Sequence, residues 1–286
     1  MTIKQAITIG TEKLRQKQID QPSLEAELLL AKILKKDRVF ILTNDKKNLT
    51  IKQNLHYRYL INLKTKNWPT AYLLGQQEFF GLDFKVNKHT LIPRPETELL
   101  VESALKLIPN KDPITIIEVG TGSGCIIISV ADNNTNQEAN YIAIEISKKA
   151  IKMARLNAEN HHLNQKIKFI KGGLLSPIIK QQFSDPVMIL ANLPYLTPNQ
   201  FKSSLSIQRE PQSALISGND GLDLYRQMLK QAKGLKAPKL TLIIEIDPAQ
   251  TSTIKELACN NWPQAKTEVL KDLRGQDRII IIEALK

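Results

Sequence analysis

The pattern of hydrophobic and polar positions indicates helices in the first part of the chain. Leu24–Leu34 is rich in residues that favour helix. Ser23 directly precedes this run and is a suitable N-cap, because its hydroxyl can accept a hydrogen bond from a free backbone N–H. We therefore expect residues 1–75 to form a small helical bundle.

A second helical run covers Ile51–Lys66. Leu55, Tyr59 and Leu63 follow one another there at the spacing of one helix face. Apolar side chains on one face of a helix usually point toward the core of the domain. The pattern thus predicts that these three side chains are buried in the bundle.

The period changes after the bundle. Phe79–Val86 has a glycine turn between apolar and alternating residues, which predicts a β-hairpin, and we assign residues 76–92 to this connector. Two prolines at positions 93 and 95 then favour an extended entry into a helix, whose first turn carries Glu96 and Glu98.

Beyond residue 112, short apolar strands alternate with helical stretches such as Lys148–Asn160. Continuous apolar strands of this kind are typical of a parallel sheet that is covered on both faces. We therefore predict a doubly wound α/β domain over residues 93–286. The expected strands are Ile114–Val119, Tyr141–Glu145, Ile167–Ile170, Val187–Ala191, Leu240–Ile246 and Arg278–Ala284.

Two features at the ends of the first two strands indicate a nucleotide-type site. The first strand runs into a glycine-rich loop, where glycines allow a sharp turn and a close approach of the backbone to a ligand. Glu145 ends the second strand and can accept hydrogen bonds from both hydroxyls of a ribose. The loop alone fits a dinucleotide or S-adenosylmethionine about equally. Its residues are Gly120, Thr121, Gly122, Ser123 and Gly124.

The tetrapeptide Asn192-Leu193-Pro194-Tyr195 follows the fourth strand and indicates methyl transfer to a planar nitrogen. The lone pair of such a nitrogen is delocalised, and an enzyme can help by accepting hydrogen bonds from both of its N–H groups, which favours the nucleophilic geometry in the transition state. The side-chain carbonyl of Asn192 and the backbone carbonyl of Leu193 are the predicted acceptors. Pro194 stiffens the turn, and Tyr195 offers a ring face to the substrate.

The distribution of charge along the sequence bears on the kind of partner that the chain binds. The formal net charge is +12, and residues 1–88 contribute 16 Lys and Arg against 8 Asp and Glu. This asymmetry favours docking of something acidic on the N-terminal part, although lysines spread over a solvated surface explain the charge as well.

Other sequence features exclude several classes. The sequence has neither a long apolar span nor a signal peptide, which favours a cytoplasmic protein. Cys125 and Cys259 are expected in the core. The histidines fit no ligand pattern, so we expect no metal. These are His56, His89, His161 and His162.

At these motifs the chain resembles the bacterial peptide chain release factor N5-glutamine methyltransferases, which methylate the glutamine of the Gly-Gly-Gln motif in class-1 release factors. The resemblance extends over nearly the whole chain. It rests on Pro69–Gly75, Thr90–Glu98, Gly120–Gly124, Asn192–Tyr195, Arg209–Pro211, Asp220–Tyr225 and Lys271–Arg278.

The resemblance implies a seven-stranded, Rossmann-like class I methyltransferase domain that uses S-adenosyl-L-methionine. It implies that the N-terminal bundle docks the release factor and that Asn192 and Leu193 hold the glutamine amide. Arg94, Thr97 and Glu98 would form a wall of the substrate site. The cofactor site would comprise Gly120–Gly124, Glu145, Gly173, Leu174 and Asn192.

Three positions depart from the family pattern. Leu193 stands where the family usually has proline, Glu145 where it has aspartate, and Gly173 where it has an acid that contacts the adenine amine. Glutamate keeps the ribose contact with a longer arm. Gly173 offers no side-chain acceptor, and losing one such hydrogen bond costs ~0.5–1.5 kcal/mol of cofactor binding.

Other functions remain open from the residues. A ribosomal-protein glutamine methyltransferase or an adenine-N6 methyltransferase of nucleic acid would share the tetrapeptide, although a base methylator acting on a duplex needs base flipping and a strongly basic surface. A non-enzymatic scaffold that binds a translation factor or RNA is the alternative from another class.

Overall fold

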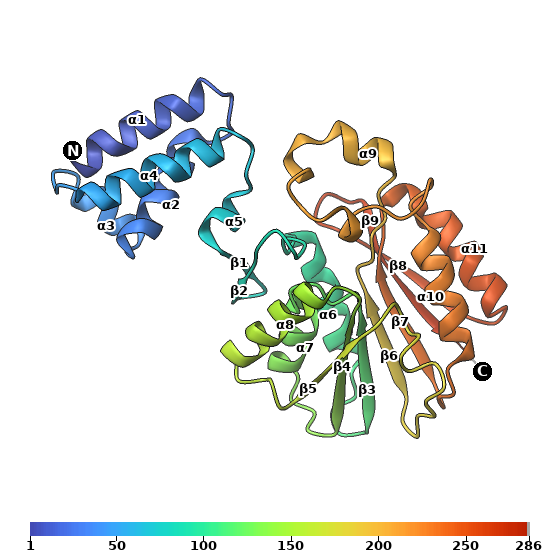
Figure 1. Ribbon diagram of the computed structural model, residues 1–286. Coiled ribbons are helices and arrows are strands. Elements are labelled where there is room, and N and C mark those ends of the chain that lie inside the picture. Colours follow the sequence, from blue (N-terminus) through green and yellow to red (C-terminus); the bar gives the residue numbers. More distant parts are fainter. Residues whose placement is uncertain (285–286) are drawn as a thin grey trace. The chain divides into compact units, whose positions relative to one another are not determined.

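The computed structural model describes residues 1–284, and these divide into two compact units (Figure 1). One unit comprises Met1–Gln76 together with the distant segment Ser204–Arg209. The other comprises Gln77–Ser203 and the chain from Glu210 onward. The helical unit therefore receives a piece of chain from between two elements of the second unit.

The first unit is a bundle of five helices. Thr2 begins the first helix with a capping box, in which its hydroxyl accepts from Gln5 N at 3.2 Å while the Gln5 side chain accepts from Thr2 N. Ser23 is not an N-cap, contrary to our expectation: the second helix begins at Pro22, and Ser23 donates to Glu27. The helices are α1 (Ile3–Arg15), α2 (Pro22–Leu34), α3 (Arg38–Thr43), α4 (Ile51–Lys64) and α5 (Thr70–Leu74).

Helix α4 buries a different face from the one predicted. Its core residues are Tyr57, Leu60 and Ile61. Leu55 and Tyr59 are 61% and 58% exposed, so the prediction that they are buried was wrong, whereas Leu63 is partly buried and packs against the core of the bundle. The helix has two apolar faces, and packing against α2 and α1 buries only one of them.

A hairpin and a helix open the second unit. Strands β1 (Gln76–Phe79) and β2 (Leu82–Lys85) pair as predicted, and the buried rings of Phe79 and Phe84 meet edge to face at 6.1 Å. A short 3-10 turn, η1 (Pro95–Thr97), leads into α6 (Glu98–Leu107).

The main sheet has seven strands in the order β5-β4-β3-β6-β7-β9-β8. The first five strands in that order are parallel, and β9 and β8 extend the sheet in antiparallel pairing. The sequence pattern predicted every strand except β8. The strands are β3 (Ile114–Val119), β4 (Ala139–Glu145), β5 (Ile167–Lys171), β6 (Val187–Ala191), β7 (Leu240–Glu245), β8 (Lys266–Lys271) and β9 (Asp277–Ala284).

Apolar side chains cover the sheet on both faces, as expected for a doubly wound domain. Leu100 of α6 and Ile126 of α7 belong to one buried cluster, whereas Tyr225 of α10 and Ile254 of α11 belong to the other. The fold is thus the predicted Rossmann-like one. The remaining elements are α7 (Cys125–Asn133), α8 (Lys148–Asn160), α9 (Pro198–Ser203), η2 (Leu205–Ile207), η3 (Gln212–Ala214), α10 (Asp223–Gly234), η4 (Pro248–Gln250) and α11 (Thr251–Asn261).

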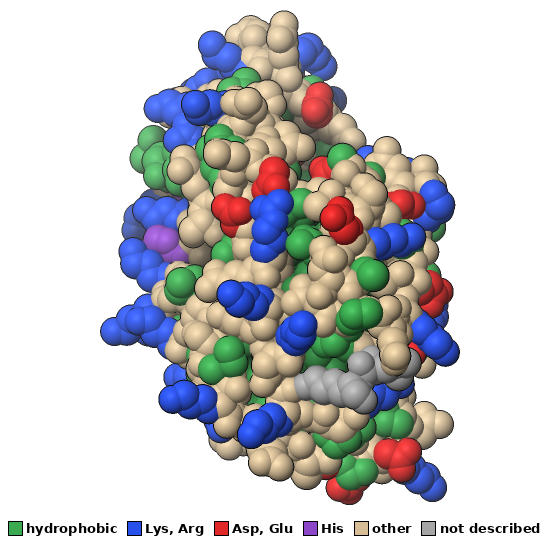
Figure 2. All heavy atoms as spheres, turned by 90° about the vertical axis from the view of Figure 1, so that its right-hand side faces the viewer, with side chains coloured by type: hydrophobic (Ala, Val, Ile, Leu, Met, Phe, Trp, Pro, Cys, Tyr) green, Lys and Arg blue, Asp and Glu red, His purple; other side chains and the backbone are tan. Residues whose placement is uncertain are grey.

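Two sequence-based expectations concern the surface. Cys125 is buried, but Cys259 is exposed on α11, so the prediction of two core cysteines was half wrong. On the face drawn in Figure 2, Lys and Arg side chains are spread out, with Asp and Glu among them, rather than gathered in one field. No helix within residues 1–284 is long and apolar enough to cross a membrane.

Candidate active site

The glycine loop and the tetrapeptide lie at one edge of the sheet, because β3 and β6 are parallel neighbours and the two segments follow their carboxyl ends. Strands β4 and β7 flank this pair on either side and end in Glu145 and Glu245. Ligands of open parallel sheets bind at this edge.

The glycine loop has the backbone that its sequence predicts. Gly120, Gly122 and Gly124 have φ angles of 75°, 56° and 85°, which side chains with a Cβ rarely adopt. Position 124 also lacks space, because a Cβ there would lie 2.9 Å from Ile128 Cδ1. The loop can therefore turn sharply into α7.

Glu118, inside β3, ties the loop to the helix. Its carboxylate accepts hydrogen bonds from the Thr121 hydroxyl and from Ile127 N at 3.2 Å. Burial raises the pKa of Glu118 to about 8, against the lowering effect of these two hydrogen bonds. The carboxyl group therefore fixes the glycine loop to the first turn of α7, and it also lines a small cavity beside the loop.

Glu145, the predicted ribose contact, ends β4 and lies beside the glycine loop. Its Oε2 accepts from Gly122 N at 2.9 Å, and its Oε1 accepts from Ser147 N at 2.7 Å. A carboxylate has about four lone-pair sites, so two remain for the hydroxyls of a ligand. The longer side chain of glutamate reaches the glycine loop and is fixed by it.

A cavity of about 340 Å³ begins at these residues. Its lining includes eight of the predicted site residues: Gly120, Gly122, Glu145, Gly173, Leu174, Asn192, Leu193 and Pro194. Thr121 and Ser123 line a smaller neighbouring cavity instead, and Gly124 lines neither. Sequence reasoning missed His89, Gln227 and Gln231, which also line the larger cavity.

The loop after β5 closes one side of this cavity. Gln231 of α10 fixes the loop, because its Oε1 accepts from Leu175 N at 2.8 Å. Leu174 has a φ of 50°, the left-handed region that is uncommon outside glycine. A Cβ at Gly173 would have its nearest neighbour, Ile146 Cδ1, at 3.7 Å, an ordinary contact distance.

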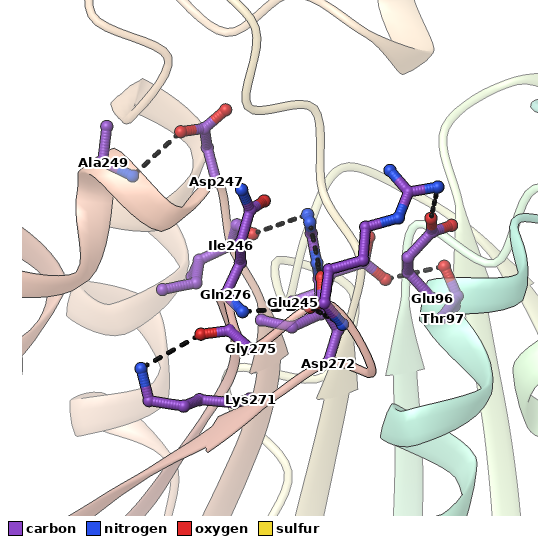
Figure 3. Close-up of polar contacts among 12 residues, drawn as sticks. Glu96, Thr97, Glu245, Ile246, Asp247, Ala249, Lys271, Asp272, Gly275 and Gln276 are labelled. Carbon is purple, nitrogen blue, oxygen red and sulfur yellow. Dashed lines mark hydrogen bonds and ion pairs between the residues drawn. The ribbon is translucent and has the colours of Figure 1, made fainter.

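The amide of Asn192 is held by its nitrogen. Nδ2 donates to Glu245 Oε2 at 2.8 Å and to Thr97 Oγ1 at 3.1 Å. The Thr97 hydroxyl in turn donates to Glu245 Oε2 at 2.7 Å. Figure 3 shows Thr97, from the turn before α6, pointing toward Glu245 of β7.

The rest of the tetrapeptide is fixed by the segment Asp220–Tyr225. The Tyr225 hydroxyl accepts from Leu193 N at 3.2 Å and donates to the backbone carbonyl of Glu245. Gly221 lies against the next turn, since a Cβ there would be 2.1 Å from the Tyr195 carbonyl oxygen. The segment Asp220–Tyr225 thus packs against the backbone of the tetrapeptide and fixes it.

The predicted substrate wall separates into residues with different contacts. Arg94 and Thr97 line the small cavity together with Asn192, and Arg94 forms an ion pair with the buried Glu210. Glu98 instead accepts from Phe80 N at 2.9 Å and so holds the hairpin turn. Tyr195 lines neither cavity, and its hydroxyl lies 3.4 Å from Glu245 Oε1.

Sequence reasoning missed Glu245, which is 1% exposed and contacts both the amide of Asn192 and the hydroxyl of Tyr195. The available signal was an acidic residue at the carboxyl end of a predicted strand, the same position that drew attention to Glu145. Burial raises its pKa to about 7.

Comparison with known proteins identifies the family. A release factor glutamine methyltransferase of Clostridium botulinum is 34% identical over 98% of both chains. This chain belongs to the release factor glutamine methyltransferase family. Another member, from Enterococcus faecalis, is 37% identical over 76% of each chain. The PrmC N-terminal domain model matches residues 5–75, and a methyltransferase domain model matches residues 110–213.

Solved structures agree on the fold. The human METTL16 catalytic domain, in complex with a hairpin of the MAT2A 3′UTR, has a TM-score of 0.56 and 16% identity, covering 90% of this chain and 91% of its own. At this identity the likeness concerns the fold that members of the release factor glutamine methyltransferase family share with other methyltransferases.

Proposed function

We propose that the chain transfers a methyl group from S-adenosylmethionine to the side-chain amide nitrogen of a glutamine, in the Gly-Gly-Gln motif of a class-1 peptide chain release factor in the cytoplasm. One observation carries the proposal: Asn192 lines both cavities, the larger one with Glu145 and the smaller one with Arg94 and Thr97. A single amide therefore lies between the predicted cofactor and substrate residues.

The residues of the larger cavity fit the cofactor. Glu145 keeps two lone-pair sites for ribose hydroxyls, and the glycine loop lets the backbone approach the ligand. The volume of about 340 Å³ lies within the usual range for small-molecule sites. S-adenosylmethionine, when bound, supplies an electrophilic methyl group on a sulfonium.

The chain's own residues then act on the nitrogen. The carboxamide oxygen of Asn192 and the backbone carbonyl of Leu193 each accept one N–H of the glutamine amide, which favours a nucleophilic nitrogen. The N–C bond forms as the S–C bond breaks, and the nitrogen releases one proton to solvent. Orientation provides most of the acceleration.

The helical unit would dock the protein substrate. Ile51, Leu55 and Tyr59 form an exposed apolar stripe along α4, which we call the α4 stripe. Helix α4 carries Lys52 and Arg58 and lacks acidic residues. The α4 stripe therefore suits a release-factor face with apolar groups and acidic neighbours.

The test is methylation of a purified release factor with labelled cofactor, its Gly-Gly-Gln glutamine intact or replaced by alanine. We expect label on the intact factor and background on the variant, with the site assigned by mass spectrometry. Equal label on both factors would refute the glutamine assignment. Label on a ribosomal protein or on nucleic acid, with none on the release factor, would favour the related methyltransferases.

A further inference from the structure

We infer that Glu245 is a positioning residue, which turns the amide of Asn192 so that its oxygen, and not its nitrogen, is presented to the substrate. The inference rests on the proposed function for its consequence in catalysis. It rests on hydrogen-bond geometry alone for the orientation of Asn192.

Counting donors fixes the orientation. The carboxamide nitrogen of Asn192 has two N–H groups, and the structure gives it two acceptors, Glu245 Oε2 and Thr97 Oγ1. Thr97 can accept because it uses its own proton to donate to Glu245. The nitrogen is thus saturated, and the carboxamide oxygen remains for the cavities that Asn192 lines.

The reverse orientation is excluded by charge. If the amide turned over, its oxygen would face the ionised carboxylate of Glu245, which can only accept, and the Thr97 hydroxyl, whose proton is already donated. Acceptors would then face one another in a buried site without a proton between them, which strongly disfavours this orientation. An ionised Glu245 thereby selects one amide orientation.

The same residue reaches two other positions of the tetrapeptide. Glu245 Oε1 lies 3.4 Å from the Tyr195 hydroxyl, and the Glu245 carbonyl accepts from Tyr225, which holds Leu193 N. Glu245 of β7 therefore helps to position both proposed acceptors of the glutamine amide, Asn192 directly and Leu193 through Tyr225.

The charge state of Glu245 depends on its surroundings. Burial raises its pKa to about 7, and the hydrogen bonds from Thr97 and Tyr195 oppose this. Among charged groups, Arg278 of β9 lowers the pKa and Glu96 of η1 raises it. Burial raises the pKa values of Cys125 of α7 and Tyr225 of α10, so both stay neutral; Glu118 and, less strongly, Glu245 add to the effect at Cys125, and Glu245 adds to it at Tyr225.

Protonation removes the selection. A protonated carboxyl group is a donor on one oxygen, so it can face the carboxamide oxygen of Asn192 as readily as its nitrogen. Activity should therefore require the ionised form. The turnover number would rise as pH increases through about 7.

The kinetic test uses Glu245→Gln, which keeps the shape of the side chain but replaces one acceptor oxygen with a donor. We expect kcat to fall roughly tenfold or more, while KM for the release factor and the dissociation constant for S-adenosylmethionine stay within about threefold. The variant should also lose the acidic limb of the pH profile. In an Asn192→Ala background, the substitution should change kcat by less than about twofold, because Glu245 acts through Asn192.

A second readout does not need turnover. In protein labelled with nitrogen-15 at asparagine, the side-chain N–H signals of Asn192, assigned from Asn192→Ala, should exchange slowly with solvent at about pH 8 and faster in Glu245→Gln. Equal exchange in both proteins would overturn the inference even if the release factor were not the substrate.

The controls separate the outcomes. Glu283→Gln alters a glutamate of β9 that pairs with Thr241 at the opposite end of β7, and should leave kcat and its pH profile unchanged. A wild-type protein that does not methylate the release factor would refute the proposed function alone. An active wild type whose kcat and pH profile are matched by Glu245→Gln would refute the role of Glu245 alone.

Discussion

The phenol oxygen of Tyr225 lies 3.2 Å from the backbone nitrogen of Leu193 and accepts its N–H. The proline usual in the family would have no N–H at position 193. A proline would stiffen this position through its ring, whereas the leucine is held by the hydrogen bond from its N–H to the buried Tyr225 hydroxyl. The leucine side chain also packs closely, since a Cβ at Gly120 would lie 3.1 Å from Leu193 Cδ2.

This hydrogen bond gives the first prediction. Tyr225→Phe leaves Leu193 N and the Glu245 carbonyl without their partner, which should cost about 1–3 kcal/mol of unfolding free energy. Urea unfolding measures that loss, and kcat should fall with it because the Leu193 carbonyl is no longer fixed. In a Leu193→Pro background the cost of Tyr225→Phe should be smaller, and equal costs would contradict the coupling.

Gly173→Asp should strengthen cofactor binding. The position has space for a side chain, and a carboxylate there can accept from the adenine amine. We expect the dissociation constant of S-adenosylmethionine to fall about two- to tenfold, as for one added hydrogen bond.

Calorimetric titration measures the change, and Gly172→Asp is the matched control. A Cβ at position 172 would lie 2.1 Å from Pro177 Cγ, so this variant should bind the cofactor more weakly than the wild type. Unchanged affinity in Gly173→Asp would show that the adenine lies elsewhere.

Asn192→Ala should lower the methylation rate by more than about tenfold while changing cofactor affinity little, because it removes an interaction made mainly in the transition state. Asn192→Asp keeps an acceptor oxygen but cannot donate to Glu245, so it should be equally impaired. Single-turnover kinetics distinguish chemistry from binding. A wild-type rate in either variant would remove Asn192 from the proposed site.

Glu118→Gln should change how stability depends on pH. The folded protein raises the pKa of Glu118 from 4.5 to about 8, so between these values it binds a proton that the unfolded chain releases. The stability that Glu118 contributes to the wild-type protein is fully present below the pKa of the unfolded chain. It is lost as pH rises toward 8, so the free energy of unfolding falls by at most about 1.4 kcal/mol per pH unit.

Glutamine does not titrate, and its oxygen can still accept from Thr121 and Ile127. The variant should therefore gain stability relative to wild type as pH rises from about 5 to about 8, measured by urea unfolding. A difference that stays constant with pH would contradict the raised pKa.

The α4 stripe predicts a specific kinetic defect. Leu55→Gln and Tyr59→Gln alter exposed side chains, so the melting temperature should stay nearly constant while KM for the release factor rises about fivefold or more. Methylation of a short Gly-Gly-Gln peptide should be unaffected. Leu156→Gln, at a side chain of α8 that is 43% exposed, is the control.

The central part of the fold could be predicted because its strands are continuous apolar runs. Val187–Ala191 is buried throughout, as expected of a strand that is covered on both faces of the sheet. The edge strand β8 was missed because its first three residues are exposed and only Val269 and Leu270 are partly buried. An edge strand exposed in this way shows neither a continuous apolar run nor a regular alternation of apolar and polar residues, which are the two sequence signals of a strand.

The wrong burial prediction for α4 and the omission of Glu245 from the predicted site have different causes. Periodicity shows that a helix has an apolar face, but Tyr59 and Leu60 lie on different faces and only packing decides between them. The role of Glu245 depends on the pairing of β6 with β7, which brings it beside Asn192 although 53 residues separate them in sequence. The glycine loop and Glu145 needed no such pairing to be noticed.

The segment Ser204–Arg209 has a practical consequence for dissecting the protein. Within the helical unit, Arg209 lies over the Trp68 ring at 5.5 Å and donates to the Lys66 carbonyl at 3.2 Å. A gene fragment that starts at Gln77 would still encode this segment but not the helices on which it rests. The helical unit is therefore not a separable N-terminal domain, because its last segment, Ser204–Arg209, follows the tetrapeptide in the sequence.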